Sequence, residues 1–273
     1  MNRIDAPGPL RSAHQKALER AVTQLEHRSF ATRLADYAGQ PLERILRALP
    51  PPASRTLNGI MEAAILQCLN LTIRSIGREA RSAPASRFLL LAAGINGGIG
   101  GFIGMAALPV ELPLTTGLML RAIADTARHY GEDLTRLDAR LACLEVFALG
   151  IPGGRNRMDV GYFATRALLA RLAADASAYL VERGAVGAAA PVVNSLVTEI
   201  ASRFGLVVSE RFAASAVPVL GAAGGVMVNL LFMNHFQQVA QGHFIIRRLQ
   251  RLYGAATVQA HYEAVVAGGM RGS

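Results

Sequence analysis

The sequence predicts an all-α protein, a helical bundle that contains two long apolar helical hairpin segments broken by glycine and proline. Three observations support this class. Apolar residues recur every three or four positions along almost the whole chain, the spacing of one helix face. Strands alternating with helices, typical of a doubly wound sheet, are absent from the pattern. Two runs, 88–110 and 212–234, each contain 23 residues without a charge.

The N-terminal half divides into helices by its apolar spacing and its prolines. The first predicted helix is amphipathic and the second is short, ending at Pro50-Pro51-Pro52, because proline cannot continue a helix. A third helix is predicted over 54–81, followed by the glycine-rich run to about Ala107. The apolar positions of the first two helices are Leu18, Val22, Leu25, Phe30, Leu34 and Tyr37, then Leu42, Ile45, Leu46 and Leu49.

The C-terminal half continues with helices only. The pattern predicts a helix from Leu114 to Tyr130, stopped by Gly131, and a next helix capped by Asp133. A basic, glycine-rich loop covers 150–157. Further helices are predicted over 159–183 and 185–204, then a helix ending at Tyr253 and a short one over 255–267.

The run 88–110 combines membrane-spanning length with glycine spacing. A helix of 23 residues rises about 35 Å at 1.5 Å per residue, enough to cross a bilayer core of about 30 Å. Its glycines form overlapping pairs four residues apart, which let two helix backbones approach closely. These glycines are Gly94, Gly97, Gly98, Gly100, Gly101 and Gly104. Because prolines interrupt both runs or border them, we expect re-entrant or peripheral helices rather than straight spans.

Charge is distributed unevenly along the chain. Residues 1–90 hold 13 basic and 7 acidic residues (+6), 91–210 hold 10 and 11 (−1), and 211–273 hold 5 and 1 (+4). Hydrophobic residues make up 52% and the mean hydropathy is +0.30. Basic ends around an apolar middle favour adsorption to an anionic membrane surface. Nucleic acid is not expected as a partner, because basic residues are not interleaved with aromatic ones.

The cysteines and the N-terminus indicate a cytoplasmic setting. Cys68 and Cys143 lie in apolar helical patterns and are expected to be buried free thiols in a reducing compartment. The first 20 residues contain no apolar segment of the kind found in secretory signals. We therefore expect a protein at the cytoplasmic face of the membrane.

Several long stretches resemble the EcsC family of bacterial proteins. They are LPVELPLTTGLMLRAIADTARHYGEDL (108–134), RLACLEVFALG (140–150), GYFATRALLA (161–170) and the segment 216–254. The resemblance covers roughly 85–262. We expect three parts along the chain: an amphipathic N-terminal helical region (1–52), an EcsC-like helical domain (53–267) and a tail (268–273). Two departures are Asn234, where aspartate is expected before histidine, and the proline in the 150–157 loop. The family takes its name from a protein encoded beside an ATP-binding-cassette transporter, so the resemblance implies a transporter or another membrane protein as partner.

Isolated polar residues in apolar helices are the candidate functional residues. They are Glu111, Arg121, Asp125, Glu145, Asn229, His235 and His243. A buried unpaired carboxylate costs several kcal/mol, so each needs a partner or a purpose. The structural interpretation pairs Asp125 with Arg121 or Arg128 on its own helix, and lets Glu111 and Glu145 accept hydrogen bonds from Arg121, Arg171 or free amides at helix starts. Pro113, near the first helical position, would direct such amides toward Glu111.

The alternative interpretation of the same residues is a metal or acid–base centre. Carboxylates and histidines are common metal ligands, but His235 and His243 are eight residues apart and lie about 80° out of register on a helix. No phosphate-binding GxxxxGK[ST] motif or G-x-S-x-G motif is present. No cofactor is therefore expected, and a metal remains an alternative.

The sequence leaves three alternative functions for the protein. The first is a non-enzymatic, membrane-associated protein that binds lipid or assists a transport or secretion system. The second is a metal- or carboxylate-dependent enzyme acting on an apolar, lipid-like substrate, centred on Glu111, Asp125 and His235. The third is a soluble helical bundle without membrane contact.

Overall fold

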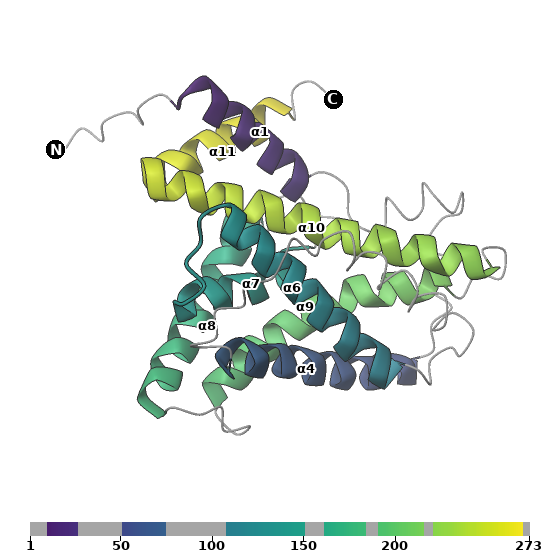
Figure 1. Cartoon of the computed structure of the whole chain (residues 1–273). Coiled ribbons are helices and arrows are strands. Elements are labelled where there is room, and N and C mark those ends of the chain that lie inside the picture. Colours follow the sequence, from purple (N-terminus) through teal and green to yellow (C-terminus); the bar gives the residue numbers. More distant parts are fainter. Residues whose placement is uncertain are drawn as a thin grey trace.

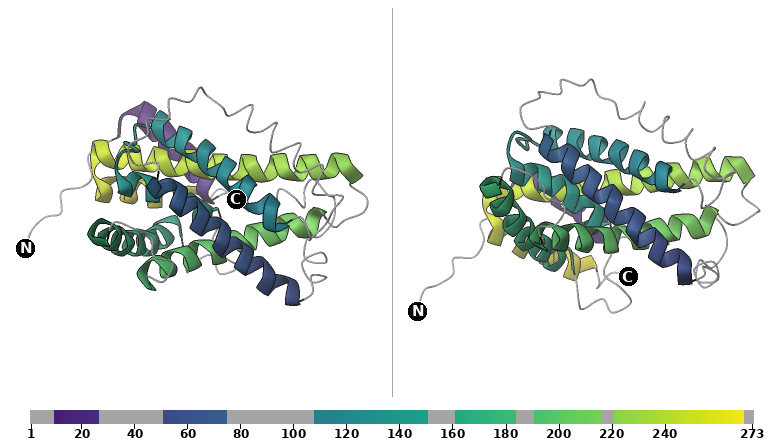
Figure 2. Two further views of the ribbon diagram at one scale, coloured as in Figure 1. Left: turned by 60° about the horizontal axis from the view of Figure 1, so that its bottom comes forward. Right: turned by 90° about the horizontal axis from the view of Figure 1, so that it is seen from below.

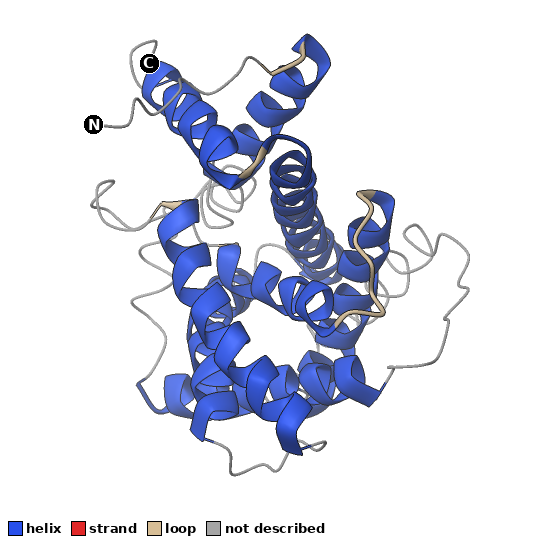
Figure 3. Ribbon diagram, turned by 90° about the vertical axis from the view of Figure 1, so that its left-hand side faces the viewer, coloured by secondary structure: helices blue, strands red, loops and turns tan. Residues whose placement is uncertain are grey.

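Helices and the short turns beside them make up the described part of the chain. A computed structural model describes residues 10–26, 51–74, 108–150, 161–183, 191–215 and 221–269, and within these ranges it contains no strand (Figure 3). The helices are α1 (Ser12–Glu26), α4 (Pro51–Arg74), α6 (Leu108–His129), α7 (Leu137–Leu149), α8 (Tyr162–Arg183), α9 (Pro191–Ser215), α10 (Gly221–Tyr253) and α11 (Ala255–Gly269). The predicted all-α class is confirmed.

Helix α7 forms the centre of the bundle. Every residue from Ala139 to Leu149 is buried, and α7 contacts α4, α6, α8, α9 and α10. Phe147 packs its ring against Phe204 of α9 and Phe236 of α10, with ring centroids 4.9 and 5.7 Å apart. Helix α7 is therefore buried around its whole circumference rather than along one apolar stripe, because other helices surround it on all sides.

Helix α10 divides the remaining helices into two groups. Figure 1 shows α1 and α11 on one side of α10 and α6, α7 and α9 on the other. Helix α4 lies against α6 and α9, as both views in Figure 2 show. Helix α1 packs on α10 so closely that a Cβ at Gly242 would lie 2.8 Å from Cγ of Leu25 and 3.2 Å from the carbonyl oxygen of Ala21.

Two predicted helix starts were wrong, and both lie close to prolines. Helix α4 begins at Pro51 rather than residue 54, since proline is tolerated in a first helical turn, where the N–H groups have no partner. Helix α6 begins at Leu108, six residues before the predicted Leu114, and contains Pro113. Pro113 is thus inside the helix and not at its first position, while Glu111 lies in the first turn.

The turn between α6 and α7 follows the predicted glycine but not the predicted cap. Gly131 has a φ of 81°, a left-handed conformation that favours glycine at a helix end. Asp133 does not cap α7. Its carboxylate accepts from the backbone N–H of Thr135 at 2.9 Å and from the Thr135 hydroxyl at 2.7 Å, while the N-cap residue is Arg136, without a side-chain cap hydrogen bond.

Several predictions concern residues outside the described ranges. These are the short helix over 42–49, the run from 88 to 107 with its glycine pairs, and the 150–157 loop beyond Gly150. The second apolar run is divided between the end of α9 and the start of α10, two helices that contact each other. The helix predicted over 185–204 is α9, displaced to Pro191–Ser215. Cys68 and Cys143 are buried free thiols, as predicted.

One described helix is long and apolar enough to cross a membrane. It is Pro191–Arg211 of α9, and half of its most apolar window is buried against the rest of the protein. A core helix of a bundle meets the same criterion. Length and composition therefore give only weak support to a membrane span at α9.

Candidate ligand-binding site

The structure places Glu111 in a buried ion pair with a distant arginine. Its carboxylate accepts a hydrogen bond from Nη2 of Arg211 on α9, and the two side chains are only 11% and 6% exposed. The guanidinium of Arg211 also lies over the ring of Phe232, 5.1 Å from its centroid. The expectation from the sequence that Arg121 or Arg171 would be the partner of Glu111 was wrong. The pair links the start of α6 to the second half of α9.

Asp125 forms the local ion pair that the sequence predicted. Nη1 of Arg128 donates to its carboxylate at 2.8 Å, three residues further along α6. Arg121 is exposed on the same helix. Such an ion pair at the surface of a helix contributes about 0.3–0.5 kcal/mol, so these residues fit the structural interpretation.

His235 caps the central helix. Its Nε2 lies 2.7 Å from the carbonyl oxygen of Gly150, at the C-terminal end of α7, where carbonyl groups lack helical partners. A Cβ at Gly150 would lie 3.0 Å from that nitrogen and 2.9 Å from Cε1 of Phe236. Only glycine allows this approach of α10. Asn229, two turns earlier on α10, is also buried.

Glu145 and His243 share one electrostatic environment. Burial raises the pKa of Glu145, and the positive charges of Arg166 and Arg247 oppose this shift. Burial also lowers the pKa of His243 well below 6.5, and the same two arginines lower it further. Nδ1 of His243 lies 3.0 Å from the hydroxyl of Tyr162, while its Nε2 is buried without a hydrogen-bond partner. The structure thus brings two of the seven candidates near one pair of arginines.

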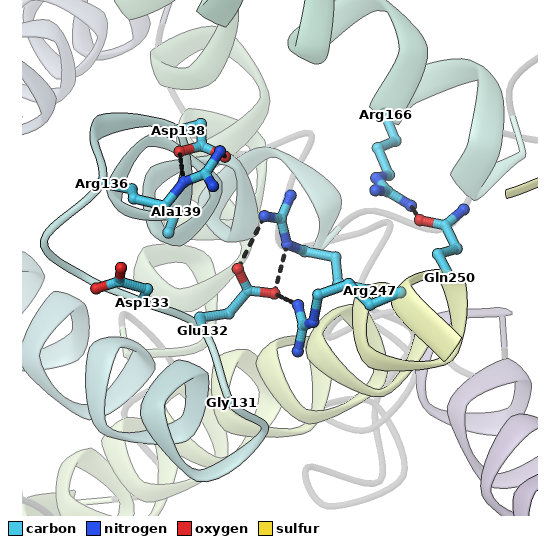
Figure 4. Close-up of a pocket in the computed structure, with 10 residues that line it drawn as sticks. Gly131, Glu132, Asp133, Arg136, Asp138, Ala139, Arg166, Arg247 and Gln250 are labelled. Carbon is cyan, nitrogen blue, oxygen red and sulfur yellow. Dashed lines mark hydrogen bonds and ion pairs between the residues drawn. The ribbon is translucent and has the colours of Figure 1, made fainter. Parts of the chain in front are cut away.

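An arginine-lined cleft lies over this region, where the α6–α7 turn faces α8 and α10 (Figure 4). Its volume is about 450 Å³. Arg247 donates from Nε and Nη2 to the two oxygens of Glu132, each at 2.9 Å, and Arg251 donates to the same carboxylate. The lining residues are Gly131, Glu132, Asp133, Arg136, Asp138, Ala139, Arg166, Arg247, Gln250 and Arg251.

The pKa values of the three carboxylates in this cleft are lowered. Burial would raise the pKa of Glu132, but its hydrogen bonds with Arg247 and Arg251 and their charges outweigh burial and hold the pKa below 4.5. Asp138 accepts from Nε of Arg136 at 3.0 Å and from Nη2 at 3.2 Å. Three of the four arginines in the cleft therefore have a carboxylate partner.

A second cavity, of about 720 Å³, lies between α8 and α11. Aromatic and small apolar side chains form much of its wall. Tyr162 and Tyr262, which both line it, stack on each other with ring centroids 5.6 Å apart, and the Tyr262 hydroxyl donates to Glu26 at 2.7 Å. The lining residues are Glu26, Gly161, Tyr162, Phe163, Ala164, Arg166, Ala167, Ala170, Gln250, Gln259, Tyr262, Glu263, Val266 and Ala267.

Arg166 and Gln250 line both cavities. Nη1 of Arg166 donates to Oε1 of Gln250 at 2.6 Å, a contact drawn in Figure 4. The Arg166 guanidinium also lies 6.0 Å from the centroid of the Tyr162 ring. This contact between α8 and α10 forms the boundary between the polar cleft and the more apolar cavity.

Sequence reasoning missed most of this site. Tyr162 and Arg166 stand in the stretch GYFATRALLA, and Arg247, Gln250 and Arg251 stand in the last helix of the resemblance, so both segments had been singled out. Arg247, Arg248 and Arg251 lie near the end of the helix predicted to stop at Tyr253, and the spacing does not show that Arg247 faces inward to Glu132. Within the described ranges, no three His, Cys, Asp or Glu side chains are placed to hold one metal ion.

Comparison with known proteins gives one family. The EcsC protein family matches residues 12–249, which extends from α1 to the last turn but one of α10. The match begins well before residue 85, where the sequence resemblance had been placed, and so includes α1. No curated protein and no solved structure matches the chain.

Proposed function

Because this chain belongs to the EcsC protein family, we propose that it is a non-enzymatic protein of the cytoplasmic face of the membrane that binds a lipid-like ligand. In this role it assists a membrane transport or secretion system. The observation that carries the proposal is the cavity of about 720 Å³ between α8 and α11. Its volume lies within the roughly 300–1,000 Å³ of small-molecule sites.

The walls of this cavity suit a hydrocarbon chain. Three alanines, Ala164, Ala167 and Ala170, face it from α8, and small side chains leave space that larger ones would fill. Phe163 and Val266 add apolar surface. Because the three alanines are exposed in the free protein, an acyl chain lying on them would remove apolar surface from water, and full burial of a methylene group contributes about 0.8 kcal/mol.

The charge distribution supports association with an anionic surface. The two basic ends carry +6 and +4, which at about 1 kcal/mol per basic residue near the headgroups favours binding to anionic lipid. The enzyme alternative receives no comparable support, because Glu111, Asp125 and His235 are engaged by three different partners: Arg211, Arg128 and the carbonyl of Gly150.

Vesicle sedimentation tests the proposal against the soluble bundle. We expect the protein to sediment with vesicles of phosphatidylcholine and phosphatidylglycerol at low salt and to be partly released at high salt. The Debye length falls from about 30 Å at 0.01 M salt to about 3 Å at 1 M, so screening weakens charge attraction and leaves apolar contacts. Recovery in the supernatant at low salt would overturn membrane association.

The cavity is tested separately with short-chain lipid. Ala167→Phe places a ring in the cavity, and Ala178→Phe, at an exposed position of the same helix outside it, is the matched control. In calorimetric titration with dioctanoylglycerol, Ala167→Phe should weaken binding and Ala178→Phe should not. Equal affinities for both variants and the wild type would show that the cavity is not the lipid site.

A further inference from the structure

We infer that the arginine-lined cleft and the α8/α11 cavity form one bipartite site for a phosphate-bearing amphiphile. In this arrangement the phosphate lies among the arginines beside Arg166, and the acyl chain lies in the cavity. The inference rests on the proposed function, which it deepens by naming the headgroup chemistry. It depends on four observations: two residues line both spaces, Arg166 has no direct ion pair, the cleft carries a net positive charge, and the cavity beyond Arg166 has an apolar lining.

The shared wall joins the two spaces at a single polar contact. Arg166 and Gln250 border both, and their side chains meet at 2.6 Å between Nη1 and Oε1. A ligand that replaces the Gln250 oxygen on Arg166 would therefore reach into both spaces. Gln250 is neutral, so an anionic oxygen would bind the guanidinium more strongly than the amide does.

Arg166 differs from the other arginines of the cleft. Arg136 pairs with Asp138, and Arg247 and Arg251 pair with Glu132. Among the residues that the structure describes, no carboxylate lies within 4.0 Å of Arg166. Its guanidinium contacts the Gln250 amide and the side chain of Tyr162, and its positive charge acts on the buried carboxyl of Glu145. Of the four arginines in the cleft, Arg166 is therefore the one that lacks a direct ion pair, and an added anion would stabilise its partly buried guanidinium most.

The cleft as a whole carries a positive charge. Four arginines stand against three carboxylates, Glu132, Asp133 and Asp138, which leaves +1. A guanidinium presents N–H donors in a planar fork that matches two oxygens of one phosphate. The exposed side chains of Arg136 and Arg251, 68% and 42% exposed, retain donors that can turn toward the same anion.

The apolar space begins directly behind Arg166. Its helix neighbours Phe163, Ala167 and Ala170, at spacings of three, one and four residues, line the cavity with Val266 of α11. A free phosphate ion would leave this space unfilled. An amphiphile that has both a phosphate and an acyl chain would occupy both the cleft and the cavity, so we assign the site to a lipid phosphate.

Calorimetric titration with three soluble probes tests the assignment. The probes are dioctanoyl phosphatidate, dioctanoylglycerol, which has the same chains without phosphate, and inorganic phosphate. The wild type should bind the phosphatidate about tenfold or more tightly than the glycerol, since hydrogen bonds to charged groups contribute about 1.5–3 kcal/mol. Arg166→Gln should remove this preference. Arg248→Gln, an exposed arginine of α10 that lines neither space, should keep it.

The outcomes separate the inference from the proposed function. Equal binding of both dioctanoyl lipids with no effect of Arg166→Gln overturns the bipartite site and leaves lipid binding intact. Failure of both lipids to bind overturns both proposals. Binding of inorganic phosphate alone, lost in Arg166→Gln, overturns the lipid assignment in favour of a free anion. Circular dichroism of each variant confirms that a loss of binding does not reflect unfolding.

Discussion

Arg247 on α10 holds Glu132 of the α6–α7 turn by two hydrogen bonds, from Nε and Nη2, each 2.9 Å long. The Glu132 side chain is 4% exposed and that of Arg247 is 19% exposed, so the pair is largely withdrawn from water. Arg251 adds a hydrogen bond to the same carboxylate and another to the carbonyl oxygen of Tyr130, at 2.6 Å. Residues more than 100 positions apart thereby fix one wall of the arginine-lined cleft.

We expect Glu132→Ala to reduce the free energy of unfolding by about 3–5 kcal/mol, because it leaves Arg247 buried without its anion. Glu132→Gln retains one hydrogen-bond acceptor and should cost less. Urea denaturation measures both. The control is Asp138→Asn, which breaks the exposed pair with Arg136 and should cost at most about 1 kcal/mol. Similar losses for Glu132→Ala and Asp138→Asn would contradict a structural role of the buried pair.

Gly242→Ala should loosen the contact between α1 and α10. The added Cβ would lie 2.8 Å from Cγ of Leu25 and 3.2 Å from the backbone oxygen of Ala21, so α1 must move. Overpacking of this kind costs about 1–3 kcal/mol. Gly117→Ala is the control, because nothing lies within 4 Å of a Cβ there. This helical position should be stabilised by about 0.5–1 kcal/mol.

Thermal melting distinguishes the two glycine variants by the sign of the change in Tm. A rise in Tm for both variants would show that α1 can move without a loss of stability, and that its packing on α10 contributes little to the stability of the bundle. A fall in Tm for Gly242→Ala alone would show that this N-terminal helix contributes to the stability of the bundle. The division of the chain at residue 52 is not tested by these measurements and stays a prediction.

The local sequence pattern was sufficient to predict the all-α class and insufficient to predict the site. Apolar spacing predicts helices because it is a property of neighbours three or four residues apart, and it also predicted the Asp125–Arg128 pair. Glu111 and Arg211 are 100 positions apart, and spacing along the chain carries no information about such a contact. The same holds for Arg166 and Gln250, which become neighbours only when α8 packs near α10.

The Glu111–Arg211 pair gives a third prediction. Glu111→Ala should lower the free energy of unfolding by about 3–5 kcal/mol, because the Arg211 side chain, 6% exposed, loses its carboxylate. Glu111→Gln should cost less, since the amide oxygen still accepts from Nη2. Urea denaturation measures the loss, and vesicle sedimentation of the Gln variant tests function. A Gln variant that remains stable but no longer binds vesicles would assign Glu111 a functional role instead.

The last prediction concerns pH and His243. This histidine is buried beside Tyr162 of α8 and in the positive field of Arg166 and Arg247, and its folded pKa lies well below the 6.5 of the unfolded chain. The unfolded chain therefore binds more protons than the folded protein as pH falls below 6.5. Above pH 6.5, His243 is neutral in both states and does not reduce the free energy of unfolding. Between pH 6.5 and the lower pKa of the folded protein, the free energy of unfolding decreases as pH falls, by up to about 1.4 kcal/mol per pH unit. The raised pKa of Glu145 acts in the opposite direction, favouring the folded state in acid.

The effect of His243 is isolated by comparing wild type with His243→Gln, which replaces the titrating ring by an amide that does not titrate. The difference in unfolding free energy between the two proteins should change between pH 7 and pH 5, with wild type losing more. His129→Gln, at an exposed position of α6, controls for histidine replacement. Parallel pH profiles for wild type and His243→Gln would contradict a neutral, buried His243.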